Sequence, residues 1–437
     1  MTRPVAVTGL GVVTPAGIGV EEFSTAIHEG AGAIGEITLF DSSGFDCRIG
    51  GQLQGFSARK FVPKSYRKAV KVMARDIEIA VAAADLAVKD SGIVTRAAED
   101  QEMNIDPKRL GCKIGAGLIC TDLDELGTAV NTAVENGKFS FVKWGKHGID
   151  NLTPLWLLKY LPNMLACHVT IIHGAEGPSN TITCGEASSH LAIGEAARTI
   201  SQGAADAIIA GGAESKLNPM GLLRQSLLNR LCVDGNESPV DACRPFDSRH
   251  SGTALGEGGG MLLLEDIDRA ASRGARIYAE VVGFGAACDQ GGIDIETPTA
   301  GGLDKAVSKA ISSAGIEPQQ VDMIVAHGTG VPREDSCECQ AWKTAMGDAL
   351  ADIPAVAITG SIGSLFAGGG GTQLAIAAKA LETQQVPPTR NFASCADGCH
   401  LNLADHPRSE KIKYVVSGSF SIGGQSAALV LKKRESY

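Results

Sequence analysis

Short apolar segments alternate with longer segments of helical periodicity along the chain. The runs 5–7 and 207–212 are apolar and lead into glycines, which is typical of buried strands. Between them, 69–89 repeats apolar residues at helical spacing. We therefore predict a strand over 5–7, then a tight turn at Gly9 and Gly11, and an amphipathic helix over 69–89. The third glycine of a dinucleotide-binding fingerprint is absent, which favours this turn over a cofactor site.

Four further apolar runs follow in the second half, and each closes on a glycine turn: 279–284, 323–326, 356–358 and 414–417. Alternation of strands and helices in both halves predicts parallel or mixed sheets covered by helices. The pattern changes near residue 270, so we expect an N-terminal unit over 1–270 and a C-terminal unit over 271–437.

One stretch interrupts this alternation. Residues 139–154 are polar and contain glycine, and an apolar stretch over 155–166 follows them. We predict a surface loop over 139–154 that leads into a helix over 155–166.

Composition narrows the class of protein. The 437 residues include 54 glycines, only 5% are aromatic, and the net charge is −10. Abundant glycine with aliphatic residues is typical of a layered α/β protein. The acidic balance and the lack of a basic run disfavour nucleic acid and anionic membranes as partners. We find no signal peptide and no membrane-spanning apolar stretch in the sequence, and expect a cytoplasmic protein.

Twelve cysteines are scattered through the sequence without a paired framework, so we expect reduced thiols. Two groupings resemble metal ligands, Cys337 with Cys339 and Cys395 with Cys399 and His400. Neither has a second pair at a structural-zinc spacing, and we expect no metal site.

Long motifs carry a resemblance to a known family. Residues 244–289 read RPFDSRHSGTALGEGGGMLLLEDIDRAASRGARIYAEVVGFGAACD, and NMLACHVTIIHGAEG spans 163–177. With the opening VAVTGLGVVTP and the AHGT of 326–329, these segments resemble the β-ketoacyl-ACP synthase II (ketosynthase) family over nearly the whole chain. The resemblance implies a thiolase fold, which is a five-layer αβαβα arrangement of two pseudo-duplicated halves, and a dimer.

The chemistry of this family needs a nucleophilic cysteine at a strand-to-helix turn, two histidines and a lysine. Aligned without gaps on that pattern, the chain has Glu186 at the cysteine position and retains the first histidine as His327. Ser364 stands at the second histidine and Thr359 at the lysine. Cys184 lies two residues early, before the turn, so we do not expect it to act as the nucleophile. These losses together predict that the chain does not condense acyl groups.

The resemblance also assigns supporting residues. Asp335 and Glu338 match acidic residues that follow the first histidine, and Thr329 matches a threonine that faces pantetheine. Phe420 and Ile422 belong to the glycine hairpin whose aromatic residue gates the site in the family.

A further assignment concerns the acyl pocket of a partner subunit. In the family, the helix equivalent to 155–166 lies at the dimer interface and reaches that pocket. Leu157, Tyr160, Leu161 and Met164 are therefore candidates for its floor. Ordinary packing at the interface explains the same residue types equally well.

These features together resemble the chain-length factors of type II polyketide synthases. Such subunits lack the cysteine and have a glycine run like that of 368–371 and a Gly-Val-Pro like that of 330–332. We therefore expect a non-condensing subunit that pairs with an active ketosynthase, or with itself, during polyketide or fatty-acid elongation. No cofactor is expected beyond the acyl or malonyl group on the phosphopantetheine of an acyl-carrier protein.

Two alternatives remain open from the sequence. The chain could be a malonyl-ACP decarboxylase that starts chains with Glu186 in place of the cysteine, or a homodimeric acyl-binding protein without catalysis. The charge of Glu186 bears on the first. A helix N-terminus favours the carboxylate, whereas burial favours the neutral acid, which can donate a hydrogen bond.

Overall fold

The two halves of the chain repeat one sheet topology. A computed structural model describes residues 3–290 and 302–435. Its main sheet has the order β13-β12-β16-β17-β11-β1-β10-β9-β5-β8. Counted outward from the central pair β11 and β1, each half presents its first, fifth, fourth, second and third main strand in chain order. The N-terminal half contributes β1 (Val5–Thr14), β5 (Leu110–Ala116), β8 (Ser179–Ile182), β9 (Ala207–Ser215) and β10 (Leu255–Asp266). The C-terminal half contributes β11 (Ala279–Cys288), β12 (Met323–Val325), β13 (Ala355–Val356), β16 (Tyr414–Phe420) and β17 (Gln425–Lys432). This duplication confirms the predicted thiolase fold.

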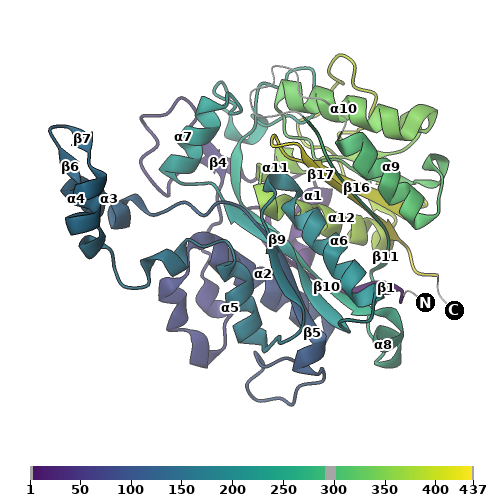
Figure 1. The fold of residues 1–437 in the computed structure, drawn as a ribbon. Helices are drawn as coiled ribbons and strands as arrows, with labels where there is room; N and C mark the ends of the chain where they lie inside the picture. The colour runs from purple at the N-terminus through teal and green to yellow at the C-terminus, as the bar shows by residue number, and fades with distance from the viewer. Residues whose placement is uncertain (1–2, 291–301, 436–437) are drawn as a thin grey trace.

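Helices complete five layers around the two halves of the sheet (Figure 1). Helices α6 and α12 contact each other and lie between the halves, with α6 against β5 and β9 and α12 against β10 and β16. Helices α2 and α5 cover the outer face of the N-terminal half, and α9 and α10 cover that of the C-terminal half. Their bounds are α2 (Arg75–Ser91), α5 (Met164–His173), α6 (Ser188–Ser201), α9 (Leu303–Ala314), α10 (Pro332–Met346) and α12 (Gly369–Thr383).

The predicted strands all occur, but the predicted turn after residue 7 is wrong. Strand β1 continues through Gly9 and Gly11 to Thr14. A Cβ atom at Gly9 would lie 2.1 Å from the carbonyl oxygen of Ala87, and one at Gly11 would lie 1.9 Å from that of Ala83. The two glycines therefore let α2 pack directly on the strand, which a larger residue would prevent.

Two predicted helices need correction. The segment 69–89 begins as a short 3₁₀ turn, becomes extended at Met73 and Ala74, and forms α2 only from Arg75. The helix predicted over 155–166 is wrong: a 3₁₀ turn covers Trp156–Lys159, and α5 begins at Met164. Pro162 explains this break, since proline disfavours helical conformation in the residue before it and cannot donate a backbone hydrogen bond.

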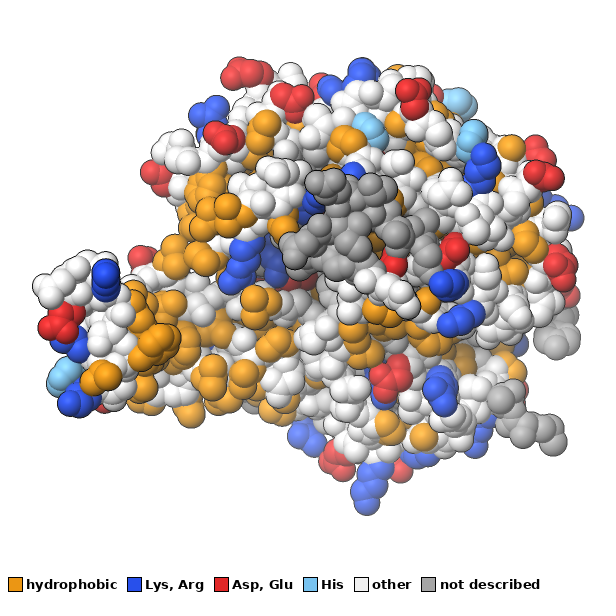
Figure 2. All heavy atoms as spheres, turned by 45° about the horizontal axis from the view of Figure 1, so that its top comes forward, with side chains coloured by type: hydrophobic (Ala, Val, Ile, Leu, Met, Phe, Trp, Pro, Cys, Tyr) orange, Lys and Arg blue, Asp and Glu red, His pale blue; other side chains and the backbone are white. Residues whose placement is uncertain are grey.

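The loop predicted over 139–154 is wrong in part, because residues 139–151 are largely helical and belong to an arm that projects from the body (Figure 1). We call residues 123–151 the arm. It contains α3 (Leu123–Thr132), a hairpin of β6 (Val134–Glu135) and β7 (Lys138–Phe139), α4 (Phe141–Lys143) and helical turns to residue 151. Figure 2 shows hydrophobic side chains along the arm and over the adjoining body.

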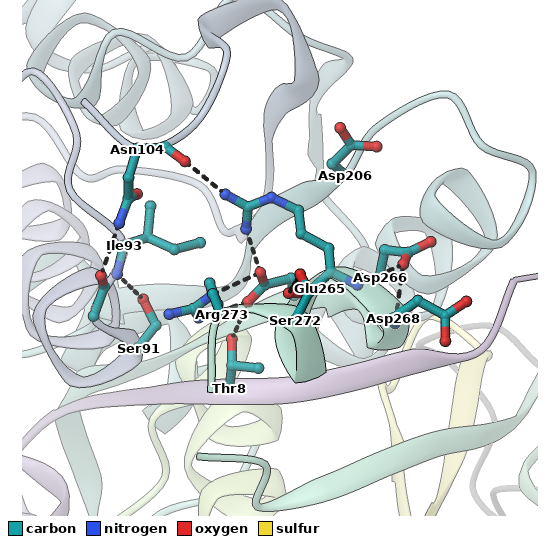
Figure 3. Close-up of polar contacts among 12 residues, drawn as sticks. Thr8, Ser91, Ile93, Asn104, Asp206, Glu265, Asp266, Asp268, Ser272 and Arg273 are labelled. Carbon is teal, nitrogen blue, oxygen red and sulfur yellow. Dashed lines mark hydrogen bonds and ion pairs between the residues drawn. The ribbon is translucent and has the colours of Figure 1, made fainter. Parts of the chain in front are cut away.

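A buried acid fastens the end of β10 to the neighbouring elements (Figure 3). Glu265 is fully buried and accepts hydrogen bonds from Thr8 on β1 and from Arg273, at 3.1 and 2.7 Å. Arg269 on α8 (Ile267–Ser272) pairs with the same carboxylate. The network fixes the chain where it passes from β10 towards β11.

Within the described ranges, no helix has both the length and the apolarity needed to cross a membrane.

Candidate functional site

Glu186 lies in a sharp turn between β8 and α6. Gly185 before it has φ +56°, a left-handed conformation that favours glycine. A Cβ atom at this glycine would also lie 2.8 Å from Cβ of Ser421. Glu186 follows in a 3₁₀ turn, with its side chain turned inward and only 4% exposed, and Ser419 donates a hydrogen bond to its backbone carbonyl at 3.1 Å. The strand-to-helix turn predicted from the sequence is therefore present.

A buried arginine occupies the space in front of this glutamate. Arg230 Nη2 donates to Glu186 Oε1 and to Glu334 Oε2, each at 2.9 Å, and Arg230 Nε lies 2.8 Å from Glu334 Oε1. The side chains of Arg230, Glu186 and Glu334 are 2%, 4% and 2% exposed. Gln225 accepts a further hydrogen bond from Arg230 at 3.0 Å. We call Glu186, Arg230 and Glu334 the buried triad.

The charges of the triad stabilise one another. Burial on its own would raise the pKa of Glu186, but the adjacent Arg230 cation and the other neighbouring groups together outweigh burial and hold that pKa below its ordinary value. Burial likewise opposes the charge on Arg230, whereas the carboxylates of Glu334 and Glu186 raise its pKa. Glu186 is therefore an ion-paired carboxylate at neutral pH, which answers the question that the sequence left open.

Two acids on α10 hold the turn that carries His327. Glu338 accepts hydrogen bonds from the backbone N–H groups of His327 and Gly328, at 2.7 and 2.8 Å. Asp335 accepts from the backbone N–H groups of Thr329, Gly330 and Phe246 at 2.7–3.1 Å. Both acids are 1% exposed. Their role here is to position the histidine turn.

His327 itself is buried beside Phe420. The two rings meet edge to face with centroids 5.2 Å apart. Burial lowers the pKa of His327 more than the nearby Glu186 and Glu334 carboxylates raise it, so the imidazole is neutral at pH 7. Its Nδ1 atom is buried and has no hydrogen-bond partner within the described chain.

Little space remains next to this histidine. His327, Thr359, Ser364 and Phe366 line a cavity of about 20 Å³, which is the room for roughly one water molecule. Thr359 donates its hydroxyl to the backbone carbonyl of His327 at 3.1 Å. His327 therefore lies next to Thr359, Ser364 and Phe420, and the cavity that His327, Thr359 and Ser364 line is too small for an acyl thioester.

Comparison with known proteins decides the family. The model of the β-ketoacyl synthase N-terminal domain matches residues 2–270, and that of the C-terminal domain matches residues 278–393. The chain belongs to the β-ketoacyl synthase family. The 3-oxoacyl-[acyl-carrier-protein] synthase 2 of Synechocystis is 33% identical over 99% of this chain and 98% of its own length, and that of Vibrio cholerae is 32% identical over 99% of both.

Solved ketosynthase structures also superpose along the full length. The ishigamide ketosynthase/chain length factor matches with a TM-score of 0.84 and 25% identity, covering 100% of both chains. A type II polyketide synthase acyl-carrier protein in complex with its ketosynthase gives the same values. A β-ketoacyl synthase from Burkholderia phymatum matches at 26% identity with a TM-score of 0.84.

The expected floor residues of this β-ketoacyl synthase family member differ in exposure. Leu157 is 56% exposed, and Leu161 and Met164 are half-buried. Of the four, Tyr160 lines a cavity of about 570 Å³, and its hydroxyl donates to Glu125 at 2.7 Å. Ile422 lies half-buried in the turn between β16 and β17.

The sequence did not indicate Arg230 or Glu334 as site residues. Arg230 follows α7 (Pro219–Leu227) in a segment that reads like an ordinary surface helix end, and Glu334 lies in the first turn of α10. A lone charged residue in such a segment normally faces solvent. The only signal was indirect: an acid at the nucleophile position that is buried in this fold needs a cation to pair with.

Other chemistry that the sequence raised finds no support in the structure. Burial raises the pKa of the Cys184 thiol, which disfavours its reactive thiolate form. In the described part of the chain, no group of three or more His, Cys, Asp or Glu side chains has the arrangement to hold a metal ion.

Proposed function

We propose that this chain is a non-condensing ketosynthase-like subunit, similar to a chain-length factor, that pairs with an active ketosynthase during acyl-ACP elongation. The buried triad carries this proposal. Glu186 stands where a nucleophile would take an acyl group, and it is an ion-paired carboxylate facing Arg230 at 2.9 Å. A carboxylate engaged in this way has neither the thiolate nor the free space that acyl transfer needs.

The same geometry argues against the decarboxylase alternative. That reaction needs hydrogen-bond donors aimed at the thioester oxygen as it becomes an enolate. His327 is a single ring beside a cavity of about 20 Å³, and Ser364 at the second-histidine position also lines it. Glu186 as the anion cannot donate a proton to that oxygen and repels the malonate carboxylate.

An exposed apolar surface supports a protein partner. Phe141 and Val142 on the arm are 83% and 67% exposed, and Leu155, Leu157 and Leu158 are 73%, 56% and 40% exposed. Hydrophobic side chains run along the arm and over the adjoining body in Figure 2. Large apolar side chains gathered on one surface are typical of protein–protein contacts. We call these five side chains the apolar surface.

A strand edge and a large cavity lie in the same half of the molecule. Strand β8 ends the sheet, and its residues Ser179 and Asn180 are exposed, so its outer backbone groups are available to a second chain. The cavity of about 570 Å³ is lined by Leu123 at the start of the arm together with Tyr160, Met73 and Met220. A partner seated on the arm would lie beside this cavity, as a subunit that shapes an acyl pocket requires.

Co-expression tests the proposal. The chain is produced together with an intact Cys-His-His ketosynthase from the same organism, and the pair is assayed with acyl-ACP and malonyl-ACP. We expect a stable complex and elongation by the pair, with no elongation by this chain alone. Phe141→Asp combined with Val142→Asp should abolish the complex, whereas Val240→Asp, at an exposed apolar residue outside the arm (41%), should not.

A stable homodimer that neither binds the ketosynthase nor changes its products would contradict the proposal and favour an acyl-binding protein.

A further inference from the structure

The arm is packed as a separate unit. Its helix α3 lies against the helical turn Trp144–Gly148 of the same arm, and Asn151 donates a hydrogen bond to Thr132 at 3.3 Å. Residues 123–151 are all described, and none of their side chains belongs to the hydrophobic clusters of the body. The angle between the arm and the body therefore depends on the contacts at the base of the arm.

One arm residue bonds to the body beyond its neighbours in the chain. Glu125 accepts a hydrogen bond from the Tyr160 hydroxyl at 2.7 Å and forms an ion pair with the Lys159 ammonium. The other hydrogen bonds and ion pairs of the described arm lie within it or reach only its flanking residues, such as Asp122. We call Glu125, Lys159 and Tyr160 the latch.

The body side of the latch is firmly anchored. Tyr160 is 9% exposed and belongs to the hydrophobic cluster of the N-terminal half, with its ring 5.3 Å from that of Trp156. Its hydroxyl also accepts from the backbone N–H of Asp122 at 3.3 Å. Burial opposes the charge on Glu125, but the hydrogen bonds from Lys159 and Tyr160 lower its pKa, so the acceptor is a carboxylate at neutral pH. Hydrogen bonds to a charged acceptor are stronger than those to a neutral one.

The latch joins the two parts of the apolar surface. Phe141 and Val142 belong to the arm, whereas Leu157 and Leu158 lie on the 3₁₀ turn that also carries Lys159. These two groups keep one arrangement only while the base of the arm is held at one angle. A preorganised surface binds a partner more tightly, because less freedom is lost on association.

We propose that Glu125 is a positioning residue that holds the arm at one angle and so presents the apolar surface to the partner subunit. The inference rests on the proposed pairing with a ketosynthase and names the residue that prepares the surface for it. Glu125 acts through Tyr160 and Lys159, and its role requires no contact with the partner itself.

Carbodiimide cross-linking of the isolated full-length chain tests whether the latch is closed in solution. This reagent joins a carboxylate to an amine that touches it as an amide, with loss of water, and mass spectrometry maps the linked peptides. We expect a link between Glu125 and Lys159. The control is the exposed pair of Lys413 and Glu435, whose side chains lie 2.8 Å apart and should also be linked. A map with the control link but without the Glu125–Lys159 link would overturn the proposal.

Partner binding tests the positioning role. Glu125→Lys places two cations together at the latch and should weaken binding to the ketosynthase by about tenfold, because the arm then spends only part of its time at the binding angle. Asp124→Lys is the matched control, since Asp124 is the exposed preceding acid on the arm and makes no described side-chain bond to the body. It should bind as tightly as the wild type. Adding Lys159→Glu to Glu125→Lys should restore most of the affinity, which a direct contact of Glu125 with the partner would not allow.

The outcomes separate this inference from the proposed function. Equal affinity of Glu125→Lys and the wild type would overturn the positioning role and leave the pairing in place. So would a charge-swapped variant that binds no better than Glu125→Lys. Failure of the wild-type chain to bind the ketosynthase would overturn the pairing, and the positioning role with it, even where the cross-link forms.

Discussion

Replacing Arg230 with methionine tests the buried triad directly. Methionine keeps much of the apolar volume of the arginine stem but removes the cation that both glutamates contact. Glu186 and Glu334 would remain as two buried carboxylates without this partner. We expect the folded state to lose stability, and the loss to depend strongly on pH.

The size of the effect follows from burial and charge. Breaking a buried ion pair by removing one partner costs about 3–5 kcal/mol. Protonation sets an upper limit on this loss of stability, because an unpaired glutamate can become neutral. The free energy of protonating it is about 1.4 kcal/mol for each unit by which the pH exceeds its ordinary pKa. For Glu186, whose ordinary pKa is 4.5, this limit is about 5 kcal/mol near pH 8 and about 1.4 kcal/mol near pH 5.5.

The contribution of Glu186 to folding stability changes with pH in opposite directions in the variant and in the wild type. In the wild type, the lowered pKa of Glu186 gives stability that is present above 4.5 and lost as the pH falls through the folded-state pKa. Without Arg230, burial raises that pKa, so stability falls as the pH rises above 4.5. Arg230→Met should therefore be much more destabilised near pH 8 than near pH 5.5.

Urea unfolding at both pH values measures this difference at one fixed protein concentration. Arg96→Met is the matched control, because Arg96 is 59% exposed and lies 3.8 Å from Glu176, where an ion pair contributes about 0–1 kcal/mol. Equal unfolding midpoints for Arg230→Met and wild type at both pH values would refute the account of the triad.

Three further predictions concern single positions. Glu186→Cys should not restore condensation, because Arg230 and the cavity of about 20 Å³ remain; a radiolabelled malonyl-ACP assay that gave β-ketoacyl product would contradict this. Asp76→Asn should stabilise the protein by up to about 4 kcal/mol near pH 8 and by almost nothing below pH 3.8, because burial and Glu214 raise the pKa of Asp76 from 3.8 to about 7. Thermal unfolding across this pH range measures the difference from wild type, and a difference that does not change with pH would disprove the prediction. Gly185→Ala should lower the stability of the folded state by about 1–3 kcal/mol, and adding Ser421→Gly should restore part of that stability. Unfolding curves in which the second change restores nothing would exclude the contact with Ser421 as a cause.

The sequence predicted the fold well where periodicity and motif agreed. Strands such as β9 and β16 appeared as apolar runs, since strands buried on both faces need such runs. The turn predicted at Gly9 and Gly11 was wrong, because glycine occurs both in turns and at close contacts between a helix and a strand. Only the position of α2 in the structure distinguishes the two. The helix predicted over 155–166 failed at Pro162, where a local backbone restriction outweighs apolar periodicity.

The site was predictable only in part. Motif positions indicated Glu186, His327 and Ser364 as site residues, because a shared fold fixes where equivalent positions lie. The partner of Glu186 was not predictable, since Arg230 approaches from a segment 44 residues away along the chain and Glu334 from the other half. Long-range ion pairs of this kind leave no local pattern in a single sequence.

The central claim is that the site of this β-ketoacyl synthase family member performs no acyl chemistry by itself. The most direct test incubates the purified chain with acyl-ACP and malonyl-ACP and follows every species by intact-protein mass spectrometry. The account predicts no acylated form of the chain, no β-ketoacyl-ACP and no acetyl-ACP. Acetyl-ACP that forms with the wild type but not with Glu186→Ala, or any condensation product, would contradict it.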